Sequence, residues 1–171
     1  DDATNFKIMR TALNITSRDA WEDVIAHRED VFVGGIELFK NYLVLEERYQ
    51  GLSRIRIKSW EGDEDYYLDF DNETYTCGIG INLDFDSEVL RYSYGSLNTP
   101  YSVMEYNFKN KSHQVLKQQE VLGEFKPDDY RTERLWFPAS DKTLIPVSLI
   151  YHKNHPPKEA PQNLLLYDSA S

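Results

Sequence analysis

The sequence predicts a mainly β protein: a partial β-propeller of about two and a half four-stranded blades, followed by the first strands of a second domain. Most of the chain consists of short segments in which apolar and polar residues alternate, separated by turn residues. This period of two is typical of β-strands. The 12 Tyr, 8 Phe and 3 Trp residues favour the same structure, because aromatic rings pack well on a pleated sheet. A four-strand pattern also recurs along the chain, as propeller blades do.

The expected strands of the first part form two repeating units, preceded by predicted strands at residues 7–12 and 21–25. The units comprise residues 31–39, 42–48, 54–59 and 66–70, and then residues 78–83, 89–94, 102–108 and 114–118. Aligning Leu43 with Leu90 gives an offset of 47 residues, within the ~40–50-residue period of propeller blades. The two units share little sequence identity, so a β-sandwich remains an alternative. A closed propeller needs about four to eight blades, so further blades are expected outside this chain.

Local patterns support individual elements of these units. In residues 54–58, Arg-Ile-Arg-Ile-Lys, the charged side chains fall on one face and the isoleucines on the other. That alternation predicts a half-buried antiparallel strand. Turn residues follow at Gln50-Gly51, at 61–63 and at 109–111. Residues 17–25 carry a helical signal with Ser17 as a possible cap, but the segment is too short to form a stable helix alone.

The character of the chain changes after residue 120. Residues 120–134 contain glycine, proline and paired aspartates, and they are predicted to be a linker. Three further strands are expected at residues 134–138, 144–151 and 163–167, with a polar, proline-rich loop over residues 152–161. The last strand is nearly all apolar, which is typical of a strand buried on both faces of a parallel or mixed sheet. A second kind of domain therefore begins near residue 131.

Composition narrows the class of protein. Nineteen basic against 29 acidic side chains give a formal charge of −10, which argues against nucleic acid as a partner and favours basic peptides weakly. No apolar run approaches the ~20 residues of a membrane span, and no signal peptide is visible at the N-terminus. The lone Cys77 favours a reducing compartment, so we expect a cytoplasmic protein, with the periplasm as the alternative. The glycosylation triplets at Asn14, Asn72 and Asn110 are interpreted as chance matches.

An ordered set of motifs resembles the oligopeptidase B (protease II) branch of the prolyl oligopeptidase family of serine peptidases. LRYSYGSLNTP at residues 90–100 is similar to the LRYxYSSxxTP segment of that family's propeller, and residues 44–48 with Gly51-Leu52 also resemble one of its blades. Residues 116–121 and 130–136 resemble the passage from the last blade into the hydrolase domain, and residues 146–151 and 164–167 resemble the opening of that domain. The chain departs from the family pattern after Tyr167, where a glycine-rich turn is expected and Asp-Ser-Ala-Ser stands instead.

The resemblance implies a division into residues 1–125, the C-terminal blades of the propeller, and residues 126–171, a linker and the N-terminal strands of an α/β-hydrolase domain. It implies a serine endopeptidase that cleaves short peptides after Arg or Lys, with the propeller limiting access to larger proteins. The catalytic serine, aspartate and histidine are expected C-terminal to this chain, which should be inactive alone. No cofactor and no metal are expected. Unpaired strand edges predict self-association.

The candidate catalytic residues in this chain each have a simpler interpretation. A nucleophile elbow needs Gly-x-Ser-x-Gly, which is absent, so Ser96 is interpreted as a turn serine. Cys77 with His27 or His113 as base is conceivable, but a cysteine in an apolar strand is usually a packing residue. His152 and His155 have a spacing seen in metal sites, yet zinc needs more ligands and a solvated loop is favoured.

The remaining clusters are also interpreted structurally. Acidic runs at residues 61–65, 69–73 and 84–88 do not fit a calcium loop and are predicted to be solvated hairpin ends. Trp21, Trp60 and Trp136 could stack on carbohydrate, but packing between blades and in the hydrolase sheet is the favoured interpretation. The alternative function is a free-standing β-rich module that binds peptides or glycans without catalysis.

Overall fold

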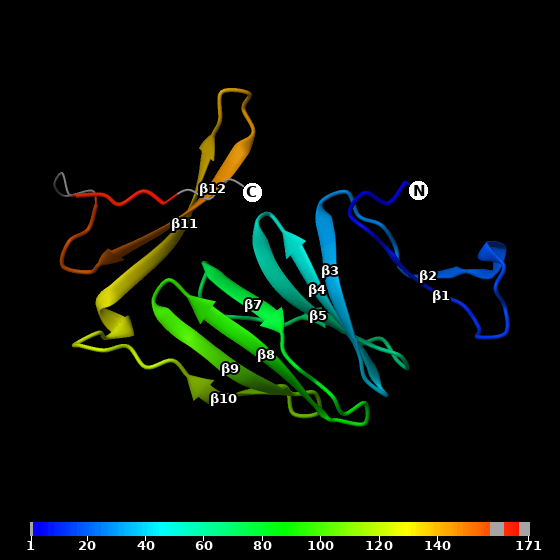
Figure 1. Ribbon diagram of the computed structural model, residues 1–171. Helices are drawn as coiled ribbons and strands as arrows, with labels where there is room; N and C mark the ends of the chain where they lie inside the picture. Colours follow the sequence, from blue (N-terminus) through cyan, green and yellow to red (C-terminus); the bar gives the residue numbers. More distant parts are fainter. Residues whose placement is uncertain (1, 158–162, 168–171) are drawn as a thin grey trace.

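The structure, a computed structural model that describes residues 2–157 and 163–167, is built almost entirely from antiparallel strands (Figure 1). Two four-stranded sheets form its centre, and a two-stranded hairpin lies at either side of them in the chain. The first hairpin consists of β1 (Ile8–Arg10) and β2 (Glu22–Ile25), with the 3₁₀ turn η1 (Arg18–Ala20) between them. The last consists of β11 (Tyr130–Pro138) and β12 (Leu144–His152), preceded by the 3₁₀ turn η2 (Pro127–Asp129).

The two central sheets have the same strand order, each strand pairing with the next along the chain. The first sheet contains β3 (Val31–Leu38), β4 (Tyr42–Tyr49), β5 (Leu52–Ser59) and β6 (Asp65–Tyr67). The second contains β7 (Tyr75–Ile79), β8 (Val89–Ser96), β9 (Thr99–Asn107) and β10 (Ser112–Gln118). This up-and-down meander of four strands is the structure of a propeller blade, so the prediction of a partial propeller is confirmed.

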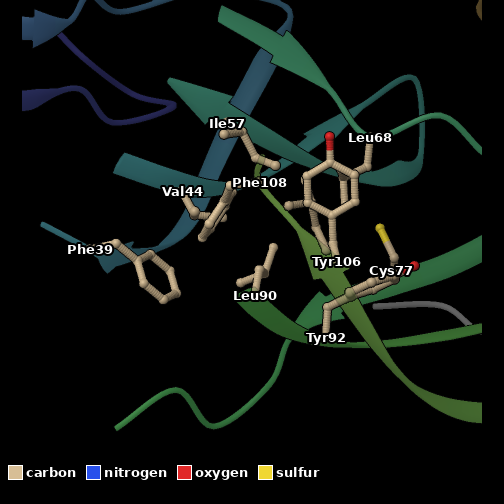
Figure 2. Packing of buried hydrophobic residues seen from close by; sticks show 10 residues of the cluster. Phe39, Val44, Ile57, Leu68, Cys77, Leu90, Tyr92, Tyr106 and Phe108 are labelled. Carbon is tan, nitrogen blue, oxygen red and sulfur yellow. The ribbon is translucent and has the colours of Figure 1, made fainter. Parts of the chain in front are cut away.

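The main core lies between the two sheets, as Figure 2 shows. Val44, Ile55 and Ile57 of the first sheet share one buried cluster with Leu90 of the second sheet, and all four side chains are almost fully buried. Aromatic rings complete the layer. The further members of this cluster are Phe39, Leu68, Cys77, Tyr92, Tyr106 and Phe108. The strict alternation of residues 54–58 therefore has the predicted consequence, since the isoleucines enter the core and the charged side chains take the opposite face.

The other face of the first sheet packs on the N-terminal hairpin. Leu43 and Leu45 of β4 form a second small core with Ile25 and Val33. Leu43 of the first sheet thus points toward the N-terminal hairpin, which precedes that sheet in the chain. Leu90 of the second sheet, 47 residues later, points toward the first sheet. The offset seen in the sequence keeps the same orientation in both blades.

Several predicted boundaries are wrong. Strand β11 begins at Tyr130, inside the segment predicted to be a linker, and pairs with β12 in continuous register from Tyr130–His152 to Pro138–Leu144. Residues 163–167, predicted to be a buried strand, form no strand and are exposed. An apolar composition favours burial, but a strand also needs hydrogen-bonded neighbours. Residues 158–161 of the predicted loop, and residues 168–171 after Tyr167, lie outside the described residues.

The packing of the two sheets predicts the effect of truncating their shared core. Replacing Leu90 with Ala removes a fully buried side chain from between the sheets and should lower the free energy of unfolding by about 2–4 kcal/mol. Urea unfolding followed by far-UV circular dichroism measures this change. The control is Leu83→Ala, at a side chain that is 94% exposed, which should change stability by less than about 0.5 kcal/mol. Equal effects of the two substitutions would contradict the described packing.

Candidate functional site

The two ends of the central sheets differ in chemistry. At one end the β4–β5 and β8–β9 connections are tight two-residue turns, Gln50-Gly51 and Leu97-Asn98. At the opposite end the β5–β6 and β7–β8 connections are longer and acidic, the β3–β4 and β9–β10 connections carry lysines, and ion pairs cross between the two sheets. Lys40 pairs with Asp86 at 3.0 Å, and Lys111 pairs with Glu64 at 2.9 Å. The acidic runs at residues 61–65 and 84–88 therefore lie at hairpin ends as predicted and tie one blade to the next, whereas the run at residues 69–73 connects β6 to β7 of the other sheet.

A pocket of about 420 Å³ lies at the end with the tight turns, between the turns and the β11–β12 hairpin. We call it the hairpin-tip pocket. It unites three parts of the chain that are far apart in sequence: the β4–β5 turn, the strands β7 to β9 near the Leu97-Asn98 turn, and the terminal hairpin. The residues that argue for a function are Gly51, Thr74, Thr76, Arg134 and Ser148. Figure 1 shows the terminal hairpin at the same end of the sheets as the β4–β5 turn.

A larger hollow of about 820 Å³ lies beside the N-terminal hairpin, but residues 2–27 alone line it. Because those residues form one local segment, that hollow is a less specific candidate than the hairpin-tip pocket.

Close backbone contact holds the terminal hairpin against the first sheet. The Arg134 guanidinium donates a hydrogen bond through Nη2 to the carbonyl oxygen of Gln50. Gln50 and Gly51 have φ values of 50° and 77°, as a type I′ turn requires. A Cβ atom on Gly51 would lie 3.4 Å from both Arg134 Nη2 and Pro146 Cγ. Glycine thus provides both the left-handed backbone and the close approach of the hairpin.

Thr74 is the unusual polar residue of this pocket. It lies just before β7 and is only 2% exposed, yet among the described residues its hydroxyl is the only buried side-chain polar atom without a hydrogen-bond partner. A buried hydroxyl without a partner costs free energy, because it has lost its hydrogen bonds to water. Such a group in a pocket wall is a candidate ligand-binding group.

A buried carboxylate lies on the face of the first sheet that meets the N-terminal hairpin. Glu47 of β4 is 1% exposed and binds three side chains. Tyr67 donates to it at 2.6 Å, Arg56 approaches at 3.5 Å, and Arg28, which precedes β3, forms an ion pair with it. Arg56 also binds Asp65 through Nε at 2.6 Å and Nη2 at 2.7 Å. The charge of Glu47 is therefore compensated within the fold, which indicates a structural role for this network.

The geometry of the candidate nucleophiles does not favour catalysis. Ser96 ends β8 beside the turn, and its hydroxyl donates to Asn98 Oδ1 at 2.9 Å. Cys77 is buried and donates through Sγ to the Ser53 carbonyl oxygen at 3.3 Å, and burial raises the pKa of its thiol to about 12. At neutral pH this cysteine is a thiol and not a nucleophilic thiolate.

The histidines are not grouped into a catalytic or metal site. His113 accepts or donates a hydrogen bond at 2.7 Å with the Tyr92 hydroxyl, and burial lowers the pKa of its imidazole. His27 lies near Asn5 in the N-terminal segment. The His152 and His155 rings lie 5.8 Å apart, but the part of the chain that the structure describes holds no cluster of three or more metal-ligating side chains.

The tryptophans are less buried than predicted. The exposed fractions of the three residues are 44% for Trp21, 40% for Trp60 and 39% for Trp136, so none is enclosed in the interior. Trp60 donates its indole N–H to the Phe39 carbonyl oxygen at 2.9 Å, and the Arg134 guanidinium lies 5.4 Å from the Trp136 ring centroid. The three residues belong to different elements and form no shared stacking surface.

The most informative residues of the pocket were not recognised from the sequence. Arg134 stood within a family-like motif, and Thr74 carried no signal, because an unpaired hydroxyl is a property of three-dimensional surroundings. The sequence signals near the site were Gln50-Gly51, a dipeptide that predicts a tight turn, and the family-like segments at residues 90–100 and 130–136.

The Asp65 ion pair makes a contribution to stability that depends on pH. Burial raises the pKa of its carboxyl, but hydrogen bonds and charge from Arg56 and Lys58 outweigh burial and lower it below the ordinary value. Stability from this group is therefore present above its unfolded pKa of about 3.9 and is lost as pH falls through the lower folded pKa. We expect Asp65→Asn to cost about 1 kcal/mol at pH 7, with a gap to the parent chain that closes below about pH 4.

Urea unfolding between pH 7 and pH 3.5 measures this gap. The matched control is Asp86→Asn, whose ion pair with Lys40 is mostly exposed, and its cost should stay within about 0.5 kcal/mol at every pH. A cost of Asp65→Asn that does not change with pH would show that the carboxylate charge is not its source.

The unpaired Thr74 hydroxyl predicts a stabilising substitution. Valine has the same shape as threonine without the hydroxyl, so Thr74→Val should raise the free energy of unfolding by about 1 kcal/mol. Thermal and urea unfolding measure the change. Thr76→Val, at an exposed position two residues later in β7, is the control and should have little effect. A destabilised Thr74→Val variant would mean that the hydroxyl has a partner in the folded protein.

Comparisons with known proteins agree with the fold. The family model described as "Prolyl oligopeptidase, N-terminal beta-propeller domain" matches residues 1–119. Dipeptidyl aminopeptidase BI of Pseudoxanthomonas mexicana is 44% identical over 155 residues, which cover 90% of this chain and 21% of that protein. Protease 2 of Moraxella lacunata is 25% identical over 151 residues, which cover 88% of this chain and 21% of that protein.

Among solved structures, oligopeptidase B of Leishmania major superposes with a TM-score of 0.68 at 28% identity, covering 80% of this chain and 20% of that protein. The chain therefore spans about a fifth of the length of the relatives it matches. The residues matched by the family model include both four-stranded sheets. The chain belongs to the prolyl oligopeptidase family, and residues 1–119 belong to its N-terminal β-propeller domain.

Proposed function

We propose that this chain is the substrate-gating propeller segment of a serine oligopeptidase, joined to the first strands of its hydrolase domain. The observation that carries the proposal is the family match over residues 1–119. We place the end of the propeller segment at residue 125 and assign residues 126–171 to the hydrolase domain. The separate hairpin β11–β12, which follows the η2 turn, supports this division.

In this proposal the chain contributes no catalytic residue, and the serine, aspartate and histidine lie C-terminal to it. The absence of Gly-x-Ser-x-Gly from the sequence supports this. The settings of Ser96 and Cys77 do so as well, because a turn hydroxyl without a base and a protonated buried thiol are poor nucleophiles. The segment acts on short peptides by controlling which of them enter.

Two specificities are compatible with the family. Cleavage after Arg or Lys, as in the oligopeptidase B type, is supported by the formal charge of −10, which attracts basic peptides at low salt. Release of dipeptides from a free N-terminus is supported by the 44% identity to a protein named dipeptidyl aminopeptidase BI. The compartment remains a prediction; no helix among the described residues is long and apolar enough to cross a membrane.

Self-association also remains a proposal. Every residue of β10 is exposed, and β10 is the edge strand of the second sheet. Its unpaired backbone groups could pair with another strand edge.

The purified chain should hydrolyse neither an N-terminally blocked Arg substrate nor a free dipeptide substrate, both with a fluorogenic leaving group. It should also resist labelling by a fluorophosphonate, which reacts with activated serines. Hydrolysis abolished by the fluorophosphonate, or labelling of a serine in this chain, would overturn the assignment of the catalytic residues to another part of the protein.

The protein encoded by the whole reading frame provides the positive control and separates the two specificities. We expect that frame to continue through a Gly-x-Ser-x-Gly motif, and its product to cleave one of the two substrates. Cleavage of the blocked Arg substrate supports the oligopeptidase B type, and cleavage of the dipeptide substrate alone supports the aminopeptidase. A stop codon directly after Ser171 would instead favour a free-standing β-rich binding module.

A further inference from the structure

We propose that the hairpin-tip pocket binds a carboxylate, and that this carboxylate is the free C-terminus of a short peptide. The peptide source rests on the proposed function, whereas the carboxylate chemistry rests on the pocket itself.

The first argument is charge. Among the described residues that line the pocket, Arg134 is the only charged side chain and none is a carboxylate. Within residues 2–157 and 163–167, Arg134 forms no ion pair, and its one hydrogen bond to a protein oxygen runs from Nη2 to Gln50. Burial lowers the pKa of this guanidinium, and the nearby Tyr75 only partly offsets the desolvation. A partly desolvated cation without a counter-charge gains free energy when an anion binds beside it.

The second argument is the set of hydroxyl groups beside that cation. Thr74 lines the pocket, and its buried hydroxyl has no hydrogen-bond partner in the described chain. Ser148 lies directly opposite Arg134 in the β11–β12 register, and both residues line the pocket. Thr76 adds a third hydroxyl. One fork of guanidinium donors with nearby hydroxyl donors suits the two oxygens of a carboxylate.

The hydrogen-bond donors that line the pocket argue against phosphate as the ligand. A phosphate dianion usually requires several cations or a row of backbone N–H groups, and this pocket offers a single arginine. The formal charge of −10 also disfavours a dianion more than a monoanion. A peptide C-terminus carries one negative charge, and the side chain of its last residue can be apolar. Leu52, Leu97 and Tyr101 form an apolar wall beside the donors, where such a side chain would pack.

The position of the pocket adds a consequence for the whole enzyme. Arg134 and Ser148 belong to the terminal hairpin, whereas Thr74 lies just before β7, the first strand of the second sheet. A carboxylate held by all three would contact the propeller segment and the start of the hydrolase segment together. Binding would therefore strengthen the contact that Arg134 already makes with the β4–β5 turn.

Isothermal titration of the 171-residue chain with Ala-Ala-Phe tests the proposal against the same tripeptide as its C-terminal amide and against sodium acetate. The tripeptide acid should bind at least about tenfold more tightly than the amide, as expected for one charge-assisted pair. It should also bind more tightly than acetate, because only the peptide contacts the apolar wall. Equal binding of acid and amide would overturn the carboxylate site, and equal binding of acetate and peptide acid would overturn the peptide source.

Three variants locate the binding. Arg134→Gln should remove the preference for the acid, and Thr74→Val should weaken binding of the acid by roughly threefold to tenfold, the effect of one hydrogen bond. Arg131→Gln is the matched control, because Arg131 is an exposed arginine on the opposite face of β11 and does not line the pocket. Unchanged binding in both Arg134→Gln and Thr74→Val, or an equal loss in Arg131→Gln, would overturn the site.

These outcomes are separable from those of the peptidase proposal. The titration reads binding by this chain alone, so its failure leaves the position of the catalytic residues untouched. A labelled serine in this chain would in turn overturn the peptidase assignment without changing the acid-to-amide ratio.

Discussion

The structure depends on one constraint: a four-stranded blade has two faces, and each must be covered by a neighbouring unit. The first sheet satisfies it fully, because Ile55 and Ile57 meet the second sheet while Leu43 and Leu45 meet the N-terminal hairpin. Such a sheet has little interior of its own, so its stability comes from the layers between units. The folding of one blade therefore depends on the presence of the next. The same requirement explains why the apolar side chains of β4 and β8 point toward neighbouring units.

The periodic part of this arrangement could be predicted from the sequence, whereas the chemistry of the faces could not. The alternation of residues 54–58 correctly predicts which side chains enter the core. It also suggests that Arg54, Arg56 and Lys58 face water, yet the structure places the buried Glu47 among them, together with Arg28 from before the first sheet. Arg28 and Glu47 are 19 residues apart in sequence. Their pairing depends on how the segment before β3 packs on β4, and a local alternation pattern carries no information about such a contact. The prediction for residues 163–167 failed for a related reason, because apolar composition does not specify a pairing partner.

The buried charges show how the fold tolerates a carboxylate in a layer between units. Glu47 occupies a position that faces the N-terminal hairpin, next to the small core of Leu43 and Leu45. Removing such a charge from water costs several kcal/mol unless partners replace the hydration. Tyr67 and Arg56 come from the same sheet, and Arg28 comes from the segment that connects β2 to β3. The ion pair between Arg28 and Glu47 therefore attaches this connecting segment to the face of the first sheet, a specific contact that an all-apolar layer would lack.

The two ends of the blades make opposite use of polar groups. At the acidic end, Glu64 and Asp86 are paired with lysines from the other sheet, so these charges are compensated inside the fold. At the end with the tight turns, Thr74 and Arg134 lack such compensation among the described residues. Folding alone gives no reason to leave a hydroxyl and a guanidinium incompletely partnered in one pocket, because each carries a desolvation cost. The asymmetry is understandable if a ligand completes the second end, and a carboxylate suits both groups because its oxygens can accept from the guanidinium and from the hydroxyl together.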